Sequence, residues 1–228
     1  MGDPERERAH DPEGERAHEG EDERGVGRLM AFTDGVVAIA ITLIVLPLVD
    51  AAQELSSKPA AEFLHDNARG LAAAALSFVV IASFWKEHHR LYQGVTGSTR
   101  SLVNANLLWI VGIVFLPLPT VLVVGSPGGD PVAAALYIGT ILVSQVALRL
   151  QILVIVRRGL LRTGARPPVA SLRPGARLWT DWIMVGLTAA ALAIAVALPV
   201  TSLYPLLLIL LARPITWLIR RRPAPRHP

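Results

Sequence analysis

The sequence predicts an all-α integral membrane protein with six transmembrane helices and both termini in the cytoplasm. Three observations lead there: the placement of the charges, the length of the apolar segments and the distribution of Lys and Arg between them. Residues 1–27 carry 10 acidic and 4 basic side chains, and residues 28–228 carry 8 acidic and 18 basic ones. The second part therefore has about half the usual charged fraction of roughly a quarter, which is too little for a water-soluble surface.

The segment 1–27 has almost no apolar side chains, so it cannot offset the entropy of ordering, and it is predicted to be a disordered acidic cytoplasmic tail. Its acidic, polar start does not resemble a secretory signal. The transmembrane domain is expected to cover 28–219, followed by a basic, proline-rich cytoplasmic end at 220–228. The absence of cysteine excludes disulfides, a thiol nucleophile and cysteine-ligated metal sites.

Six apolar runs follow the tail, each near the length of about 20 residues that a helix needs to cross a bilayer. Their approximate ranges are 29–49, 70–85, 102–124, 131–156, 179–198 and 200–219. The last two are read as a hairpin turning near Pro199, because one continuous helix would be about 60 Å long, twice the hydrocarbon thickness.

Lys and Arg alternate between the flanks of these runs. The flanks at the tail, 86–101, 157–178 and the C-terminal end carry 19 of them, whereas the segments 50–67, 125–130 and 199–202 carry one. Positive residues mark the cytoplasmic side, which puts both termini there. The basic excess is thus a signal of topology, and nucleic-acid binding is not needed to explain it.

The first predicted span contains an acid, Asp34. Ionisable groups inside a bilayer are usually paired or functional, although the first turn of a helix also favours an acid through its dipole. A narrow stripe is centred about 110° from Asp34, at about 100° per residue. It consists of Gly35, Ile39, Thr42 and Leu46. The stripe and the acid should face different surroundings, and the stripe suits either helix packing or a pore with a hydrophobic constriction.

Other polar residues should lie at the level of Asp34, because the second span ends and the third begins on the cytoplasmic side. The residues expected to meet there are Arg28, Asp34, Trp85, His88 and Asn106. An indole N–H and an imidazole are natural donors to a carboxylate. The His-Glu-x-x-His spacing of zinc sites is missing, so no metal site is predicted.

These residues fall into motifs. They are Arg28-x-x-x-Phe32-Thr33-Asp34-Gly35-Val36 with Ala38-Ile39-Ala40-Ile41-Thr42-Leu43, then Trp85 with His88-His89-Arg90-Leu91, Asn106-Leu107-Leu108 leading to Leu116-Pro117-Leu118-Pro119-Thr120, and Tyr137. Over about 32–140 the sequence resembles the transmembrane protein 175 potassium channels, in their prokaryotic single-repeat branch. That family more often has Ser at the position of Thr33. The hydroxyl group is kept, because Thr carries one as well.

The resemblance implies a potassium-permeable cation channel, not an enzyme, with no cofactor beyond permeant K⁺. It implies a homotetramer around a pore lined by the first helices, without a Thr-Val-Gly-Tyr-Gly filter. By position, Ile39 would form the apolar constriction, with Thr42 one turn deeper and Leu46 beyond it. The motif residues Arg28, Phe32 and Asp34 would tie the first helix to Trp85, His88 and Asn106 outside the pore.

Other function classes stay open at this point. A proton-coupled secondary transporter would use Asp34 as its titrating group, but carriers usually show internal repeats around a midplane site, and the two halves share no evident motif. The sequence contains no catalytic motif, which disfavours a membrane enzyme. A scaffold could use the basic loop 157–178. The expected partners are further copies of the chain and the lipid of a prokaryotic plasma membrane, with anionic lipid as a candidate at 157–178.

Overall fold

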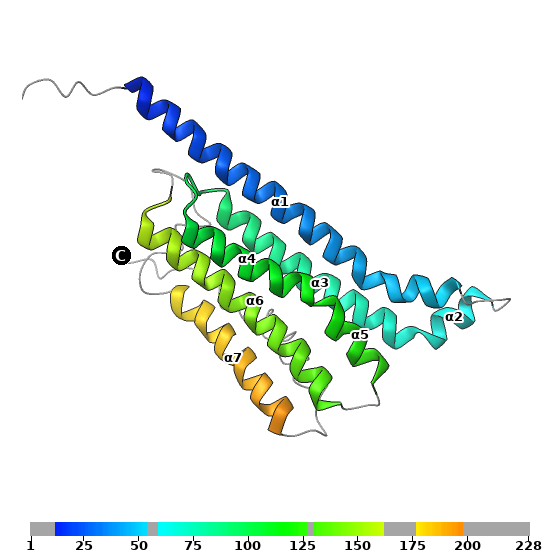
Figure 1. Ribbon diagram of the computed structural model, residues 1–228. Helices are drawn as coiled ribbons and strands as arrows, with labels where there is room; N and C mark the ends of the chain where they lie inside the picture. The colour runs from blue at the N-terminus through cyan, green and yellow to red at the C-terminus, as the bar shows by residue number, and fades with distance from the viewer. Residues whose placement is uncertain (1–11, 54–58, 127–129, 162–176, 198–228) are drawn as a thin grey trace, which may run out of the picture.

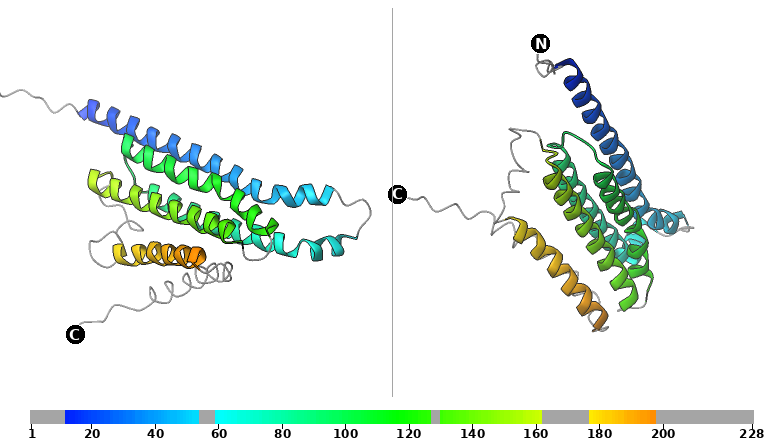
Figure 2. Two further views of the ribbon diagram at one scale, coloured as in Figure 1. Left: turned by 60° about the horizontal axis from the view of Figure 1, so that its bottom comes forward. Right: turned by 60° about the vertical axis from the view of Figure 1, so that its left-hand side comes forward.

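The computed structural model describes residues 12–53, 59–126, 130–161 and 177–197. The helices of these segments are α1 (Pro12–Gln53), α2 (Ala60–Asp66), α3 (Ala68–Tyr92), α4 (Arg100–Phe115), α5 (Pro117–Gly125), α6 (Pro131–Arg158) and α7 (Arg177–Ala197). The long helices lie side by side with alternating direction, α1 along one edge and α7 along the other (Figures 1 and 2). α1 packs against α3, α4 and α5, whereas α7 packs against α6.

Within the described residues, four helical segments are long and apolar enough to cross a membrane: Glu23–Gln53, Ala68–Tyr92, Arg100–Gly125 and Pro131–Arg158. They correspond to the first four predicted spans. α7 covers the fifth, with a shorter apolar part at Trp182–Ala197. The sixth predicted span, 200–219, and the C-terminal end 220–228 lie outside the described residues.

The N-terminal boundary differs from the prediction, since α1 begins at Pro12 and residues 12–27 are helical. Five of the 16 residues in this segment are Glu, a good helix former, although four are Gly, which disfavours a helix. The segment also extends a helix that already exists, so it avoids the cost of nucleation. Val26 is buried in the hydrophobic core, so the bundle starts before the predicted boundary at residue 28.

The third predicted span is broken into α4 and α5 at Leu116. Pro117 and Pro119 have no backbone N–H and cannot continue the regular hydrogen-bond ladder. Around the break, Leu116 N donates to the carbonyl of Ile113 and Thr120 N to that of Leu116, both at 3.3 Å. The sequence analysis treats 102–124 as one uninterrupted span, and the two prolines divide it into two helices.

The segment after α3 and the end of α6 lie together at one end of the bundle. Val95 forms an isolated antiparallel bridge with Leu161, and Thr96 N donates to the carbonyl of Leu160 at 3.0 Å. α6 ends there at Gly159, whose φ of 65° is the left-handed conformation that favours glycine. Two flanks that the Lys and Arg count assigns to one side of the membrane are therefore in contact.

At the opposite end, Asp130 caps α6. Its carboxylate accepts from Val132 N at 2.8 Å and from Ala133 N at 3.4 Å, and the bond from Val132 is the main reason why the pKa of this carboxyl is lowered. Arg69 also lies at this end, because α3 begins at Ala68, before the predicted span. It adds a second basic residue to the side with few of them.

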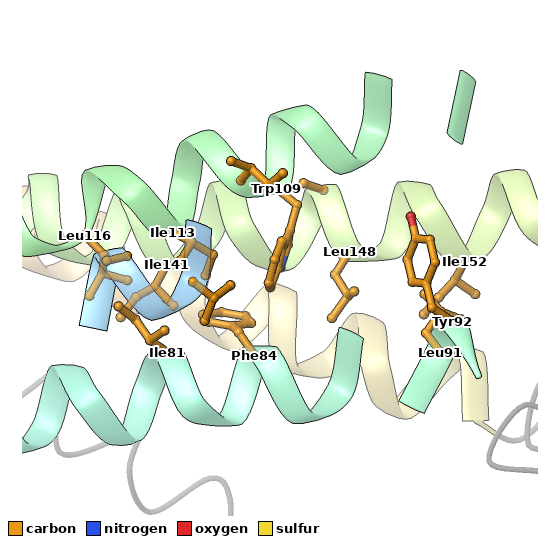
Figure 3. Close-up of a cluster of buried hydrophobic side chains, with 14 of the residues drawn as sticks. Ile81, Phe84, Leu91, Tyr92, Trp109, Ile113, Leu116, Ile141, Leu148 and Ile152 are labelled. Carbon is orange, nitrogen blue, oxygen red and sulfur yellow. The ribbon is translucent and has the colours of Figure 1, made fainter. Parts of the chain in front are cut away.

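The core lies between α3, α4 and α6 (Figure 3). Its large buried side chains include Ile81, Phe84, Trp109, Ile113, Leu116, Ile141 and Leu148. α4 and α6 cross closely at Gly112, where a Cβ would lie 3.3 Å from the Cβ of Ser144 and would clash with its Oγ. A small residue at this crossing lets the two backbones approach, as is common between transmembrane helices.

Candidate pore helix and its polar anchors

α1 has a buried face and an exposed face. Val37, Ala40 and Ile44 are 1–3% exposed and pack into the core, whereas Ile39 is 60% and Leu46 48% exposed. At about 100° per residue, the centres of the two sets lie about 145° apart. The stripe identified in the sequence is therefore the face of α1 that its own bundle leaves uncovered.

Thr42 lies on the uncovered face, one turn from Ile39. Its hydroxyl donates to the carbonyl of Ile39 at 2.8 Å. This bond uses the single hydroxyl proton, so the oxygen can only accept further interactions. An exposed acceptor oxygen on an otherwise apolar stripe suits contact with a cation or with the water around it.

Asp34 is half-buried and accepts from Trp85 Nε1 of α3 at 2.8 Å. It does not lie on the stripe, in agreement with the separation expected from the sequence. The bond connects the middle of α1 to the C-terminal part of α3. Asp34 thus has a defined structural partner, which accounts for an acid at this depth.

A second connection joins α1 to α3 through α4. Asn106 Nδ2 donates to Thr33 Oγ1 at 2.9 Å, and Asn106 Oδ1 lies 2.7 Å from His88 Nε2. Thr33 itself donates to the carbonyl of Leu29 at 2.8 Å. Because a carbonyl can only accept, every donor in the series is assigned, and His88 must carry its proton on Nε2. Thr33, His88 and Asn106 are 0–1% exposed.

The sequence predicts one cluster of polar residues, whereas the structure has two separate hydrogen-bonded connections. Asp34 with Trp85 and Asn106 with His88 are brought together, but Arg28 and Phe32 are not part of either. Both lie on the exposed side of α1, and Phe32 is 55% exposed. The sequence analysis gives Thr33 no contact, yet it takes part in the second connection. At about 100° per residue, Thr33 lies at nearly the same angle around α1 as the buried Val37 and Ile44, and this angle predicts its burial.

Two further polar contacts had no signal in the sequence. Ser77 Oγ lies 2.8 Å from Thr120 Oγ1 and 3.1 Å from Tyr137 Oη, joining α3, α5 and α6 inside the bundle. Arg149 Nη2 lies 2.6 Å from Glu87 Oε1, an ion pair between α6 and α3. Each depends on which helices are neighbours, which a single sequence does not disclose. Among the described residues, no three His, Asp or Glu side chains gather as metal ligands.

The fold and this site define a membrane-spanning helical bundle whose first helix is anchored on one face and exposes an apolar stripe on the other. The sequence model of a family described as the endosomal/lysosomal potassium channel TMEM175 matches residues 28–117. The match contains α1 from Arg28, all of α3 and α4, and both anchoring connections.

Several known proteins are similar to this chain. A potassium channel of Streptomyces collinus is 35% identical over 118 residues, 49% of this chain and 55% of the relative. One of a Chryseobacterium species is 33% identical over 94 residues, 41% of this chain and 46% of the relative. The alignments thus span about half the length of these relatives. The crystal structure of a lysosomal potassium-selective channel TMEM175 homolog from Chamaesiphon minutus matches with a TM-score of 0.61 and 26% identity, over 86% of this chain and 98% of that one.

Over residues 28–117 the chain is similar to the TMEM175 family, and its fold is similar to that of a solved TMEM175 homolog. The family and these relatives are described as potassium channels. Sequence, apolar helices and fold agree on a multi-pass membrane protein.

Proposed function

We propose that the chain is the subunit of a potassium-permeable cation channel that conducts K⁺ passively, with four copies around a central pore lined by α1. The observation that carries this proposal is the uncovered stripe of α1, which contains Ile39, Thr42 and Leu46 and lies opposite the packed face. An exposed stripe on the edge helix of a bundle is suited to meet its own copies around an axis. The names of the relatives support K⁺ as the ion.

In this proposal, four Ile39 side chains form a ring too narrow for a hydrated ion. Such a ring empties of water when closed and blocks ions without a plug. Thr42, one turn deeper, presents its acceptor oxygen to a partly dehydrated cation, and Leu46 lines the pore beyond it. K⁺ passes more readily than Na⁺ because removing its weaker hydration shell costs less. No Thr-Val-Gly-Tyr-Gly filter occurs in the sequence.

The test compares two variants that place the same polar group at matched depth. Ile39 lies eleven residues after Arg28 on α1, and Val111 lies eleven residues after Arg100 on α4; they are 60% and 59% exposed. The purified full chain is reconstituted into bilayers with unequal K⁺ and Na⁺. Ile39→Asn should raise the cation current by hydrating the constriction, whereas Val111→Asn should leave the current and the reversal potential unchanged.

The absence of any protein-dependent cation current would contradict the channel. A current that responds equally to the two variants would contradict the role of α1 while leaving the channel intact. An image of the detergent-purified assembly with fourfold symmetry and α1 at the axis would support the pore. A monomer, or α1 facing lipid, would remove it.

We propose six spans with both termini in the cytoplasm of a prokaryotic cell. We also propose that the basic segment 157–178 contacts anionic lipid. Of this segment, Arg157 and Arg158 are exposed at the end of α6. The chain has no cysteine, so one introduced thiol reports its side without background. In cells, Gln93→Cys should resist a membrane-impermeant maleimide and His65→Cys should react. The opposite result would invert the topology.

A proton-coupled carrier remains the alternative, with Asp34 as its titrating group. The bond from Trp85 and the distance of Asp34 from the uncovered stripe disfavour it. Asp34→Asn keeps an oxygen that can accept from the indole, so a channel should retain its current. Loss of a saturable, pH-gradient-dependent flux in this variant would favour the carrier.

A further inference from the structure

The hydrogen-bond series that anchors α1 has an unfinished end. From Leu29 it runs through Thr33 and Asn106 to His88, whose Nε2 donates to Asn106. The other ring nitrogen, Nδ1, is buried and has no protein partner. A buried imidazole nitrogen without a partner is costly, and the side chain is only 1% exposed. Another hydrogen-bond donor is therefore needed at His88 Nδ1.

The rings beside His88 cannot supply that partner. Trp109 and Tyr92 are both stacked on the imidazole, with centroid separations of 4.4 Å and interplanar angles of 17° and 25°. A hydrogen bond to a ring nitrogen lies close to the ring plane, whereas stacked groups lie above and below it. The indole N–H and the phenol hydroxyl also have no hydrogen-bond partner of their own, although both side chains are 0–2% exposed.

A fourth unpaired atom belongs to α6. Gln151 is fully buried, and its Nε2 donates to the carbonyl of Ala105 at 3.5 Å, which leaves Oε1 without a partner. Ala105 immediately precedes Asn106, so Gln151 reaches α4 at the level of the anchoring series. Tyr92 and Trp109 extend into the same core between α3, α4 and α6 (Figure 3).

The unpaired atoms are complementary in kind. Tyr92 Oη and Trp109 Nε1 can donate, while His88 Nδ1 and Gln151 Oε1 can accept. Water is the small molecule that offers both functions, and buried waters characteristically satisfy two to four such groups. We propose that ordered internal water is bound between α3, α4 and α6, donating to His88 Nδ1 and pairing with Tyr92, Trp109 and Gln151. This site lies inside the helical bundle of a single chain and does not depend on the proposed function.

The sign of one substitution tests the proposal. Removing a hydroxyl that is hydrogen-bonded destabilises a protein, whereas removing a buried hydroxyl without a partner relieves a penalty and stabilises it. Tyr92→Phe in the detergent-purified full chain should lower the thermal midpoint by about 2–4 °C if water pairs with the hydroxyl. A rise in the midpoint would overturn the proposal.

Tyr137→Phe is the matched control, because Tyr137 Oη lies 3.1 Å from Ser77 Oγ, a direct partner. It should lower the midpoint whether or not water is present, and so calibrates the size of a lost bond. A second measurement detects the water itself by ¹⁵N nuclear magnetic resonance, with the His88 signals assigned through His88→Gln. A cross-peak between water protons and Nδ1 is expected; its absence would overturn the proposal even if Tyr92→Phe destabilises.

Discussion

Asn106 is the residue whose replacement should disturb the anchoring of α1 most directly. Its two bonds, 2.9 Å to Thr33 and 2.7 Å to His88, connect three helices, and its side chain is fully buried. Asn106→Leu keeps the approximate volume but removes both bonds. Thr33 can still donate to Leu29, whereas His88 Nε2–H loses its acceptor inside the bundle.

The magnitude follows from these losses. A stranded buried donor costs about 1–3 kcal/mol, and a lost hydrogen bond about 0.5–1.5 kcal/mol. Together they predict a destabilisation of about 2–4 kcal/mol, or a fall of about 5–15 °C in the thermal midpoint for a chain of this size. The assay is thermal unfolding of the detergent-purified protein, followed by near-ultraviolet circular dichroism.

Asn104→Leu provides the control, since Asn104 lies on the same helix but is exposed. Its effect should stay within about 0.5 kcal/mol. A double-mutant cycle of Asn106→Leu with Thr33→Val should give a coupling of about 0.5–3 kcal/mol, because the two residues share a bond. Equal midpoints for the two Asn variants, or strict additivity in the cycle, would refute the reasoning.

Two further predictions concern helix packing. Gly112→Ala should destabilise by about 1–3 kcal/mol, because the added Cβ clashes with Ser144 at the crossing of α4 and α6. Gly139→Ala is the control, because a Cβ there meets open space. It should be neutral or stabilising by up to about 1 kcal/mol. Thermal unfolding that shows Gly139→Ala to be the more destabilising of the two variants would contradict the close crossing. Glu87→Gln should cost less than about 1 kcal/mol and lose its effect in high salt, since Glu87 is 46% exposed in its pair with Arg149; a large, salt-independent loss would show that the pair is shielded from water.

The sequence predicted the depth of residues better than their rotation about each helix. Hydropathy and the rise of a helix place Asp34, Trp85, His88 and Asn106 near one end of the bundle, and they lie there. Which of them touch depends on how the helices are rotated and paired. For that reason one expected cluster became two connections, and Arg28 lies apart from both.

The same distinction explains the contacts that were missed. The pair of Glu87 with Arg149 joins residues 62 positions apart, and that of Ser77 with Tyr137 joins residues 60 apart. No local pattern specifies such neighbours. Rotation was predictable only for α1, where Asp34 gave a reference and the stripe containing Ile39 was apolar enough to stand out.

The arrangement of α1 connects these anchors to the proposed pore. Thr33 and Ile39 are six residues apart, about 9 Å along a rigid helix, so whatever fixes the rotation of Thr33 also fixes the direction of Ile39. A rotation of about 100° toward the packed face would place Ile39 at the angle where Ala40 is buried. Asn106→Leu should therefore change the cation current of reconstituted channels. Tyr137→Phe, which weakens α3, α5 and α6 without touching α1, should leave that current intact at temperatures where both variants stay folded. Equal currents in the two variants would mean that the anchors stabilise the fold without setting the pore.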